Sequence, residues 1–527
     1  MKKSMIFAMC AFAFAFASCE QNGGNDVPAG DQEKAYVAIS LATTDGATRA
    51  AGDEFSEGLD DERAVTSAFV LFYKDGNPFL VGGENYKAIT VGDNKNPNPE
   101  TTNVSDYKEA VLVIENYKGE FPNQVVALLN YNPANIVNIN SITLAQLCDT
   151  IRELKTTEGF VMTNSVYVDA TGAAVYAYPL TQSNIAMSAD AAKNSPVQIY
   201  VERTAAKVAL TTTATGVVDR KYPLAGTEVP VGGEMKQVYS KVLGWELSNY
   251  TTSPLIKSID EGWTNDGLHI DPWNDAARHR SYWAVPRGDS FKGFEFGETT
   301  TWTYDEYKYT GENTNGNAEL VLKCQLQDEA GNALEIARWL GRDYVTRANL
   351  LVAVVNNIKY SYYYKDGSGY SQISESDLEA VLGDGNDAEA YETYFKLSTT
   401  GDDREWYKLT NGAFTAIANS PETAVADMNA ELRKIEPAIL YAGGYTYYYT
   451  PISHAFYTDG SETKSVNGVV RNHAYSINIK SIAGYGTPIN TGIGFIKPET
   501  PSEVETFVAA EIKILSWKNV SYDVDIK

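Results

Sequence analysis

The chain ends in Phe507-Val-Ala-Ala-Glu-Ile-Lys-Ile-Leu-Ser-Trp-Lys-Asn-Val-Ser-Tyr-Asp-Val-Asp-Ile-Lys527, a segment without glycine or proline. Its apolar side chains recur at alternate positions, which is the period of a β-strand. The even-numbered set is Val508, Ala510, Ile512, Ile514, Val520, Tyr522, Val524 and Ile526, interrupted by Ser516 and Lys518. About twenty extended residues span roughly 65 Å, whereas ordinary strands have about five or six residues. We therefore expect one long strand that has no obvious partner in its own domain.

The composition predicts an all-β protein. The chain has 527 residues, which suggests about three to four domain-sized units, or two large β domains with processed ends. Hydrophobic residues make up 43% of it, which excludes a disordered chain. Its 41 glycines, 19 prolines and 35 tyrosines favour many short strands joined by tight turns.

The charge argues against one class of partner. The chain has 43 Lys and Arg residues and 68 Asp and Glu residues, for a formal net charge of −25. Contacts with phosphates need clustered basic side chains. We therefore expect no nucleic-acid binding.

The first residues are typical of a secretory lipoprotein signal. Two lysines precede the apolar run from Met5 to Ala17, which is too short to span a bilayer. The run closes on Ser18 and Cys19, so we expect residues 1–18 to be the signal peptide and Cys19 to become N-terminal and lipidated. No later stretch is apolar for the ~18 residues that a membrane helix needs, so we expect the rest of the chain to be exported and soluble.

A short strand and a candidate processing site follow. Val37, Ile39 and Leu41 alternate with smaller residues, which predicts a strand with one buried face. Arg49-Ala50-Ala51-Gly52 then leads into the acidic loop 53–62. An arginine in a small, exposed stretch of this kind is accessible to an Arg-specific protease.

Further alternating runs predict strands through both halves of the chain. They cover residues 68–73, 110–114, 125–129, 197–203, 208–213, 350–355, 360–364, 445–450 and 475–479. Helical spacing appears in Thr143–Lys155, where it places Cys148 on an apolar face as a buried, inert thiol. After Gly216 the residue pattern is typical of loops, so we expect a domain boundary near residue 215.

Patterns that would indicate an enzyme are few. The four histidines, His269, His279, His454 and His473, are widely spaced and form no zinc motif. No nucleophile elbow or phosphate loop is present. The polar residues 269–275 favour a solvated loop, and the Asp366 and Asp384 segments favour turns over calcium loops. We expect no enzyme, no cofactor and no metal, although spacing alone leaves a glycosidase-type carboxylate pair open.

A second function class stays open as the alternative. Tyrosine-rich runs at 362–364 and 445–449 could offer stacking faces to a sugar, as in a surface glycan-binding lipoprotein. Alternating tyrosines in strands are more often explained by cross-strand packing. A glycan binder of this kind would remain a lipidated monomer.

Four segments, together with Cys19 and Arg49, carry a resemblance to a known family. They are Val201-Glu-Arg-Thr-Ala-Ala-Lys-Val208, Gly468-Val-Val-Arg-Asn-His-Ala-Tyr-Ser-Ile-Asn-Ile-Lys-Ser-Ile482, Ile514-Leu-Ser-Trp-Lys518 and Val520-Ser-Tyr-Asp-Val-Asp-Ile526. With these residues the chain resembles the Bacteroidales fimbrillins, in particular the minor-fimbrium (Mfa-like) shaft subunits of type V pili. One departure is the short linker before the last strand, which carries only Pro498 and Pro501.

The resemblance implies an architecture and a division of the chain. It implies two tandem transthyretin-like Greek-key β-sandwich domains with a few short helices. Residues 19–49 would be a lipidated propeptide that contains the first strand and is removed. Residues 50–214 and 215–500 would be the N-terminal and C-terminal sandwiches, and residues 501–527 would be an extended donor strand.

The resemblance also implies how such a protein works. In the precursor, the strand with Val37, Ile39 and Leu41 would pair with the edge of the N-terminal domain. An Arg-specific, gingipain-like protease would then cut between Arg49 and Ala50 and remove this strand. A neighbouring subunit's donor strand would then fill the groove, using Ile512, Ile514, Trp517, Val520, Tyr522, Val524 and Ile526. Such a contact is heterologous, so it propagates head to tail.

The implied biology is that of a surface fimbrium. The precursor would be a palmitate-bearing lipoprotein of the outer membrane, and the mature chain a structural shaft subunit on the cell surface. Its partners would be copies of itself and the anchor and tip subunits. The implied roles are adhesion, biofilm formation and virulence.

Overall fold

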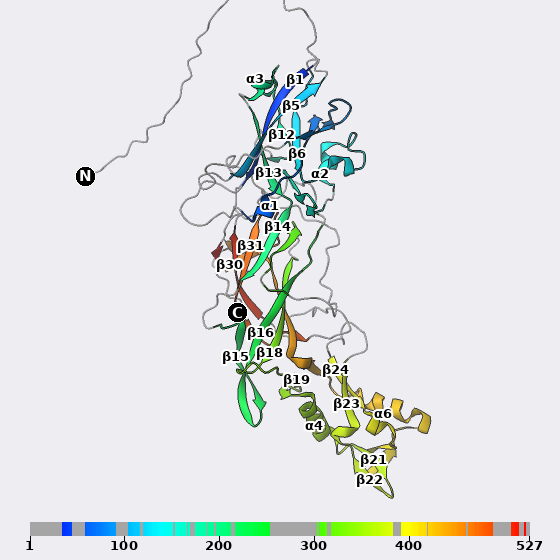
Figure 1. Cartoon of the computed structure of the whole chain (residues 1–527). Helices are drawn as coiled ribbons and strands as arrows, with labels where there is room; N and C mark the ends of the chain where they lie inside the picture. Colours follow the sequence, from blue (N-terminus) through cyan, green and yellow to red (C-terminus); the bar gives the residue numbers. More distant parts are fainter. Residues whose placement is uncertain are drawn as a thin grey trace, which may run out of the picture.

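The computed structural model describes residues 34–44, 58–90, 104–115, 120–150, 153–165, 167–168, 174–186, 188–193, 196–211, 217–252, 254, 303–304, 306–312, 318–382, 392–418, 420–459, 462–488, 507–515 and 521–522. These residues form an elongated molecule of three units (Figure 1). Strands dominate all three, with a few short helices, which confirms the predicted all-β class. None of the described helices is long and apolar enough to cross a membrane.

The N-terminal unit is built on one nine-stranded sheet. Its main path is β3 (Asn77–Pro78), β2 (Ala68–Lys74), β6 (Gln124–Leu129), β9 (Met162–Asn164), β13 (Val197–Arg203), β1 (Lys34–Thr44) and β5 (Val104–Glu115). Two further strands, β4 (Tyr86–Ile89) and β12 (Tyr178–Pro179), pair with β2 and β6.

Both faces of this sheet are covered. On one face Val70 and Phe72 of β2 share a core with Val37 of β1 and Leu112 of β5. Because β2 and β5 lie near opposite ends of the strand order, the sheet must curl around this core. Leu71, on the other face, packs into a second core with Leu147 of α2 (Leu144–Cys148). Strands with both faces buried read as continuous apolar runs, as β2 does.

The helix at Cys148 is shorter than predicted. Thr143 caps α2 by accepting a hydrogen bond from the Gln146 amide (3.2 Å), and the helix ends at Cys148. The chain then returns in a two-residue ladder of β7 (Lys155–Thr156) with β8 (Gly159–Phe160), which takes Lys155 out of the helix. Cys148 is only half-buried, so the prediction of a fully buried thiol is wrong.

The C-terminal unit is a β-sandwich of two five-stranded sheets. The first runs β17 (Lys308–Gly311), β14 (Ala205–Thr211), β31 (Ala474–Ala483), β33 (Phe507–Leu515) and β34 (Ser521–Tyr522). The second runs β15 (Lys221–Val231), β16 (Glu234–Ser248), β18 (Glu319–Gln327), β28 (Tyr445–Pro451) and β32 (Thr487–Pro488). Val208 and Ile477 of the first sheet meet Trp245, Leu322 and Tyr448 of the second in one buried core.

The change from one unit to the next falls between β13 and β14. β13 belongs to the N-terminal sheet and β14 to the sandwich, and only Thr204 separates them. This is upstream of the boundary expected near residue 215. Val197, Ile199 and Val201 share one parity, whereas Val208 and Leu210 share the other, so the alternation changes face where the sheet changes.

A third unit is inserted into the C-terminal sandwich. β18 and β28 are paired neighbours, with Leu322 opposite Tyr448, yet most of the chain between them forms a separate body with its own core. Its strands are β19 (Ile336–Trp339), β20 (Arg342–Val345), β23 (Leu378–Leu382), β24 (Glu392–Leu397) and β27 (Ala438–Tyr441) in one sheet, and β21 (Tyr362–Asp366), β22 (Gly369–Gln372), β25 (Trp406–Thr410) and β26 (Ala413–Ala416) in another. It lies at the end of the molecule away from the N-terminal unit (Figure 1).

One predicted strand of this unit is a helix. The run 350–355 lies in α4 (Arg347–Ile358), which Thr346 caps. Leu350, Val354, Val355 and Ile358 are buried, and their spacing follows a helix face rather than alternation. Val354 and Val355 are β-branched, but their preference for strands is weaker than the packing that they gain in this helix.

A carboxylate on α6 (Ala424–Leu432) gives this unit a pH dependence. Glu431 accepts hydrogen bonds from Lys408 (Nζ–Oε2 2.8 Å) and from Lys434. These bonds lower the pKa of Glu431 from 4.5 to about 2. A carboxyl with a lowered pKa contributes stability above its unfolded value and loses it as the pH falls to the folded value.

We therefore expect Glu431→Gln to destabilise the third unit at neutral pH and to match the wild type at about pH 2. The difference should be under about 1 kcal/mol because both lysines are largely exposed. Calorimetric melts across this range measure it, with Glu379→Gln as the control, since its ion pair with Lys396 is exposed. A difference that persists at about pH 2 would contradict the assignment.

Candidate assembly sites

The predicted first strand lies inside the N-terminal sheet. β1 runs parallel to β13, with Ile39 opposite Val197, and antiparallel to β5, with Val37 opposite Leu112. Val37 is fully buried in the core. The expectation that this strand pairs an edge is therefore wrong, because it has a partner strand on both sides. Its removal would leave a slot with a strand on each flank.

The predicted modification sites fall outside the described residues. These are Cys19, Arg49 and Ala50, and the structure gives them no geometry. The chain is described from Lys34 to Thr44 and again from Gly58, just before α1 (Asp60–Arg63). The expected cut would therefore fall between β1 and α1, and would separate one from the other.

The C-terminal segment has a partner in its own chain. β33 pairs antiparallel with β31, with Ile512 opposite Ile477 and Ile514 opposite Tyr475. β34 then pairs antiparallel with β33, with Tyr522 opposite Ile512. Two expectations are thus wrong: the segment has a partner in its own domain, and it reverses direction between Leu515 and Ser521.

The sequence does not reveal the pairing of β33 with β31, because alternation identifies a strand but not its neighbour. The edge of β31 that pairs with β33 exists only in the folded sandwich. The other predicted donor residues, Trp517, Val520, Val524 and Ile526, lie outside the described residues.

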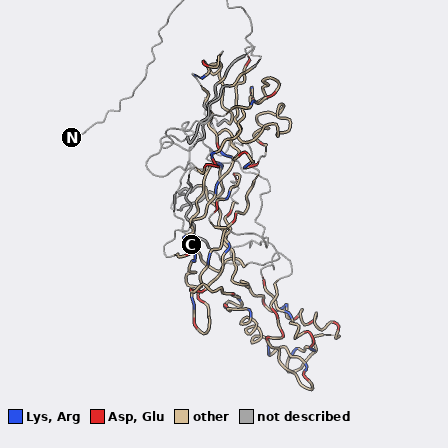
Figure 2. The backbone as a smooth tube through the Cα atoms, viewed as in Figure 1, with Lys and Arg blue, Asp and Glu red and all other residues tan. Residues whose placement is uncertain are grey.

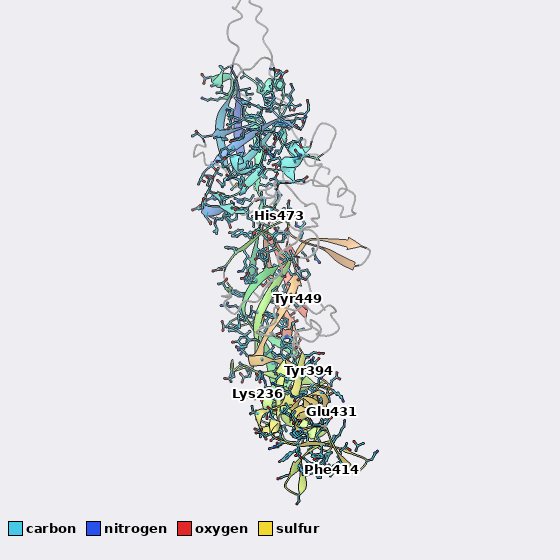
Figure 3. The ribbon with its side chains drawn as sticks, turned by 90° about the vertical axis from the view of Figure 1, so that its right-hand side faces the viewer. Lys236, Tyr394, Phe414, Glu431, Tyr449 and His473 are labelled. Atoms are coloured by element: carbon cyan, nitrogen blue, oxygen red, sulfur yellow. The ribbon has the colours of Figure 1, made fainter. Side chains whose placement is uncertain are left out.

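Two motifs far apart in sequence meet where the N-terminal unit joins the sandwich. β14 and β31 run parallel, with Lys207 opposite Ala474. The Asn472 amide donates to the Ala205 carbonyl (2.7 Å), and the Lys207 amide donates to the His473 carbonyl (2.9 Å). Arg203 Nη1 donates to Asn472 Oδ1 (3.0 Å). We call this region the joint; His473 marks it in Figure 3.

The centre of the joint is a buried carboxylate from α1. Glu62 is fully buried, and Lys207 Nζ lies 2.6 Å from its Oε1. The Tyr309 hydroxyl donates to the same oxygen, and the Leu59 amide donates to Oε2 (2.7 Å). Arg203 Nε donates to the Glu62 carbonyl (2.7 Å). Lys207 and Tyr309 belong to the sandwich, so Glu62 fastens the two units together.

The electrostatics of the joint follow from this burial. Desolvation, and then the hydrogen bond to Glu62, raise the pKa of Tyr309. Basic and acidic residues lie close together at this level of the molecule (Figure 2). A buried charge is tolerated only where a partner and hydrogen bonds compensate its lost hydration.

A second buried ion pair lies beside the first. Arg471 is fully buried, and its Nε donates to Glu312 Oε2 (2.8 Å) while Nη2 pairs with Oε1. Burial lowers the pKa of Arg471, but Glu312 and then Glu202 reverse this, so the pKa is raised. Such a two-point contact fixes orientation as well as charge.

Sequence reasoning missed the joint. The sequence pattern places Glu62 at the end of an acidic loop, where a carboxylate is normally solvated, and it assigns no role to the Val201–Val208 motif. The available signal was the presence of Arg and Lys inside alternating strands. Charges at such positions need buried partners, although the sequence cannot say which ones.

Two histidines that are widely spaced in the sequence meet in the structure. His454 and His473 have ring centroids 5.2 Å from each other. Both are buried: His454 Nδ1 lies 2.8 Å from the Tyr475 hydroxyl, and His473 Nδ1 lies 2.8 Å from the Arg471 carbonyl. Within the described ranges no His, Cys, Asp or Glu cluster could hold a metal ion. His269, His279, residues 269–275 and Asp384 fall outside those ranges.

Comparison with known proteins agrees with part of the resemblance. Residues 439–523 match the family model of the C-terminal domain of fimbrillin, the major fimbrial subunit protein type IV. This region contains β28, β31, β33 and β34, and it includes Asn472 and His473 of the joint. No curated protein matches the chain.

Two solved structures illustrate how distant the similar chains are. A fimbrial assembly protein from Parabacteroides distasonis is 13% identical, with a TM-score of 0.30 and coverage of 73% of this chain and 100% of that one. The tip fimbrial protein Mfa3 from Porphyromonas gingivalis, with a C-terminal truncation, is 11% identical, with a TM-score of 0.27 and coverage of 91% and 99%. Both scores are below 0.5, so these likenesses assign no function.

Removing the Glu62 carboxylate should uncouple the two units. Glu62→Ala leaves the Lys207 ammonium buried without its carboxylate, so we expect a loss of about 3–5 kcal/mol. Urea unfolding followed by hydrogen exchange in each unit measures this, and the N-terminal unit should open before the sandwich.

Asp60→Ala provides the control on the same helix, since Asp60 is exposed and pairs only with Arg63 among the interactions described. It should change stability by less than about 0.5 kcal/mol. Equal effects of the two substitutions would show that Glu62 does not hold the joint.

Proposed function

We propose that this protein is a structural shaft subunit of a cell-surface fimbrium, and that it polymerises by protease-triggered donor-strand exchange. The precursor is a lipoprotein carrying its lipid on Cys19. An Arg-specific protease cuts between Arg49 and Ala50. The C-terminal segment of one subunit then fills the slot that the next subunit has lost.

The single observation that carries this proposal is the position of β1. It lies between β13 and β5, upstream of the cut, and contributes fully buried Val37 to the core. A strand held on both sides would normally be a permanent part of a sheet. Only a cut on its downstream side makes it separable from the rest of the chain, in which α1 is the next described helix.

The fimbrillin-like C-terminal region supports the same role. Residues 439–523 match a fimbrial subunit family, and the proposed donor begins within that match. The alternating pattern of the donor resembles that of β1, in which Val37, Ile39 and Leu41 share one parity. An inserted strand with this pattern can replace both the apolar side chains and the backbone hydrogen bonds that β1 supplied.

The energetics favour exchange over simple addition. Each fully buried aliphatic side chain contributes ~1.5–3 kcal/mol, so three or four of them outweigh much of the ordering cost of association. Each backbone hydrogen bond adds only about 1 kcal/mol, and its main effect is on register. The chain is acidic overall, which disfavours contacts between subunits without strand pairing.

The joint has a supporting role in this scheme. Glu62 lies beyond the proposed cut and remains with the mature chain. Because it ties α1 to β14 and β17, loss of β1 need not loosen the contact between the units. The mature subunit would therefore transmit force along the shaft through a buried ionic contact.

Arg49→Lys tests the trigger because it keeps the charge and removes the residue that an Arg-specific protease reads. We expect an uncut, monomeric, lipidated precursor, seen as loss of the polymer ladder on unboiled gels and as an unprocessed N-terminus. Arg63→Lys, at the end of α1, is the matched control and should polymerise normally. Normal polymers from Arg49→Lys would refute the trigger.

A disulfide that holds β33 on β31 tests which part of the segment is donated. Ser476 is opposite Lys513 in this ladder, and Cys148 and Cys324 are the only cysteines left after the proposed cut. If residues 507–515 are donated, Ser476→Cys with Lys513→Cys should block polymerisation when oxidised and restore it when reduced. Polymerisation of the oxidised protein would limit the donated part to residues after Leu515.

A further inference from the structure

The inserted third unit carries an aromatic cluster that the assembly scheme does not use. Tyr363, Tyr370, Tyr407 and Phe414 come one each from β21, β22, β25 and β26. Phe414 marks this end of the molecule in Figure 3, far from the joint. We call these four residues the aromatic platform.

The four rings form a single contact network. Tyr370 and Phe414 stack with centroids 3.9 Å apart and an interplanar angle of 11°. Tyr407 meets Tyr370 edge to face at 5.0 Å, and Tyr363 meets Phe414 edge to face at 5.1 Å. Because β22 and β26 are the two outer strands of this sheet, their rings must reach inward over β21 and β25.

The platform lies on the face opposite the unit's core. Trp406, next to Tyr407 in sequence, is buried in that core, and alternation sends Tyr407 to the other side. After stacking, Tyr370 still keeps 41% of its surface exposed and Phe414 keeps 39%. The contacts between the rings therefore hold ring surface in a fixed geometry while leaving it open to water.

The surroundings of the platform supply hydrogen-bonding groups. Gln372 Nε2 donates to the Tyr363 hydroxyl at 3.5 Å, and the Tyr407 hydroxyl donates to Glu405 (3.3 Å). Lys365 is paired with the same Glu405 (3.7 Å). Amide, phenol and carboxylate groups around aromatic rings are a suitable environment for a neutral polyhydroxylated ligand.

Other occupants fit less well. A second copy would need about 800 Å² from each partner, whereas the exposed parts of Tyr370 and Phe414 offer roughly 200 Å². Identical subunits also carry like charge, at −25 each. Polyanions are disfavoured by the carboxylates Glu405 and Asp366 beside the platform.

We infer that the aromatic platform is a binding site for neutral carbohydrate chains, with pyranose rings lying against Tyr370 and Phe414. The C–H face of a sugar packs on an aromatic ring, and its hydroxyl groups reach Gln372, Glu405 and the tyrosine hydroxyls. Of the tyrosine runs that suggested glycans in the sequence, only Tyr363 belongs to this site. Tyr362, Tyr447 and Tyr448 are buried, as cross-strand packing predicts.

The inference does not depend on polymerisation, so it can be tested on the monomeric full-length chain. Calorimetric titration with mannohexaose, cellohexaose and chitohexaose should show binding of at least one of them. Tyr370→Ala and Phe414→Ala should each weaken that binding roughly tenfold or more, whereas Tyr370→Phe, which keeps the stack, should stay within about threefold. Tyr360→Ala is the matched control, because Tyr360 is 67% exposed on the same unit but lies outside the platform.

A footprint on the wild-type chain covers the case in which an alanine variant fails to fold. Hydrogen exchange with the bound oligosaccharide should protect residues 363–372 and 406–416 and leave the joint unchanged. Four results would overturn the inference: no binding of any neutral oligosaccharide at about 10 mM, binding of heparin alone, a footprint elsewhere, or self-association that Tyr370→Ala abolishes.

Discussion

The structure of the N-terminal unit depends on one strand that is held on both sides. β1 fills the space between β13 and β5, and Val37 completes the core beneath it. All other strands of that sheet begin after α1, so the sheet is assembled from two pieces of chain. A sheet built in this way is complete only while the first piece, or a substitute for it, is present. The proposed assembly mechanism follows from this dependence.

The joint confines the structural effect of losing β1 to the N-terminal sheet. Glu62, Lys207 and Tyr309 bring together a helix of the N-terminal unit and two strands of the sandwich through buried charged and polar contacts. Such contacts cost desolvation free energy and contribute less to net stability than apolar packing would, but they tolerate only one arrangement. The sheet can therefore exchange a strand while the two units keep their relation. The third unit lies at the far end of the sandwich, away from both features (Figure 1).

The sequence predicted the local structure well wherever alternation was regular. β1, β2, β6, β13, β28 and β31 all fall on predicted strands. The same reasoning failed at α4, where valines that favour strands lie on a buried helix face. This failure concerns tertiary packing, which sequence periodicity does not contain.

The candidate sites show the same limit. Alternation identified both end segments as strands, but it could not show that β1 has two neighbours or that β33 has a partner in β31. Each pairing depends on residues outside the segment itself. The roles of Glu62 and of the platform residues could not be predicted either. They depend on contacts with side chains that only the folding of distant strands brings together.

Hydrogen exchange at the flanks of β1 tests the central claim most directly. The amides of β5 and β13 would be followed in the intact chain, in the chain cut after Arg49 with residues 1–49 removed, and in that cut chain with a synthetic peptide of residues 507–527. The account predicts that cutting removes protection from β5 and β13 but not from β2 and β6, and that the peptide restores it. Unchanged protection after the cut, or no recovery with the peptide, would contradict it.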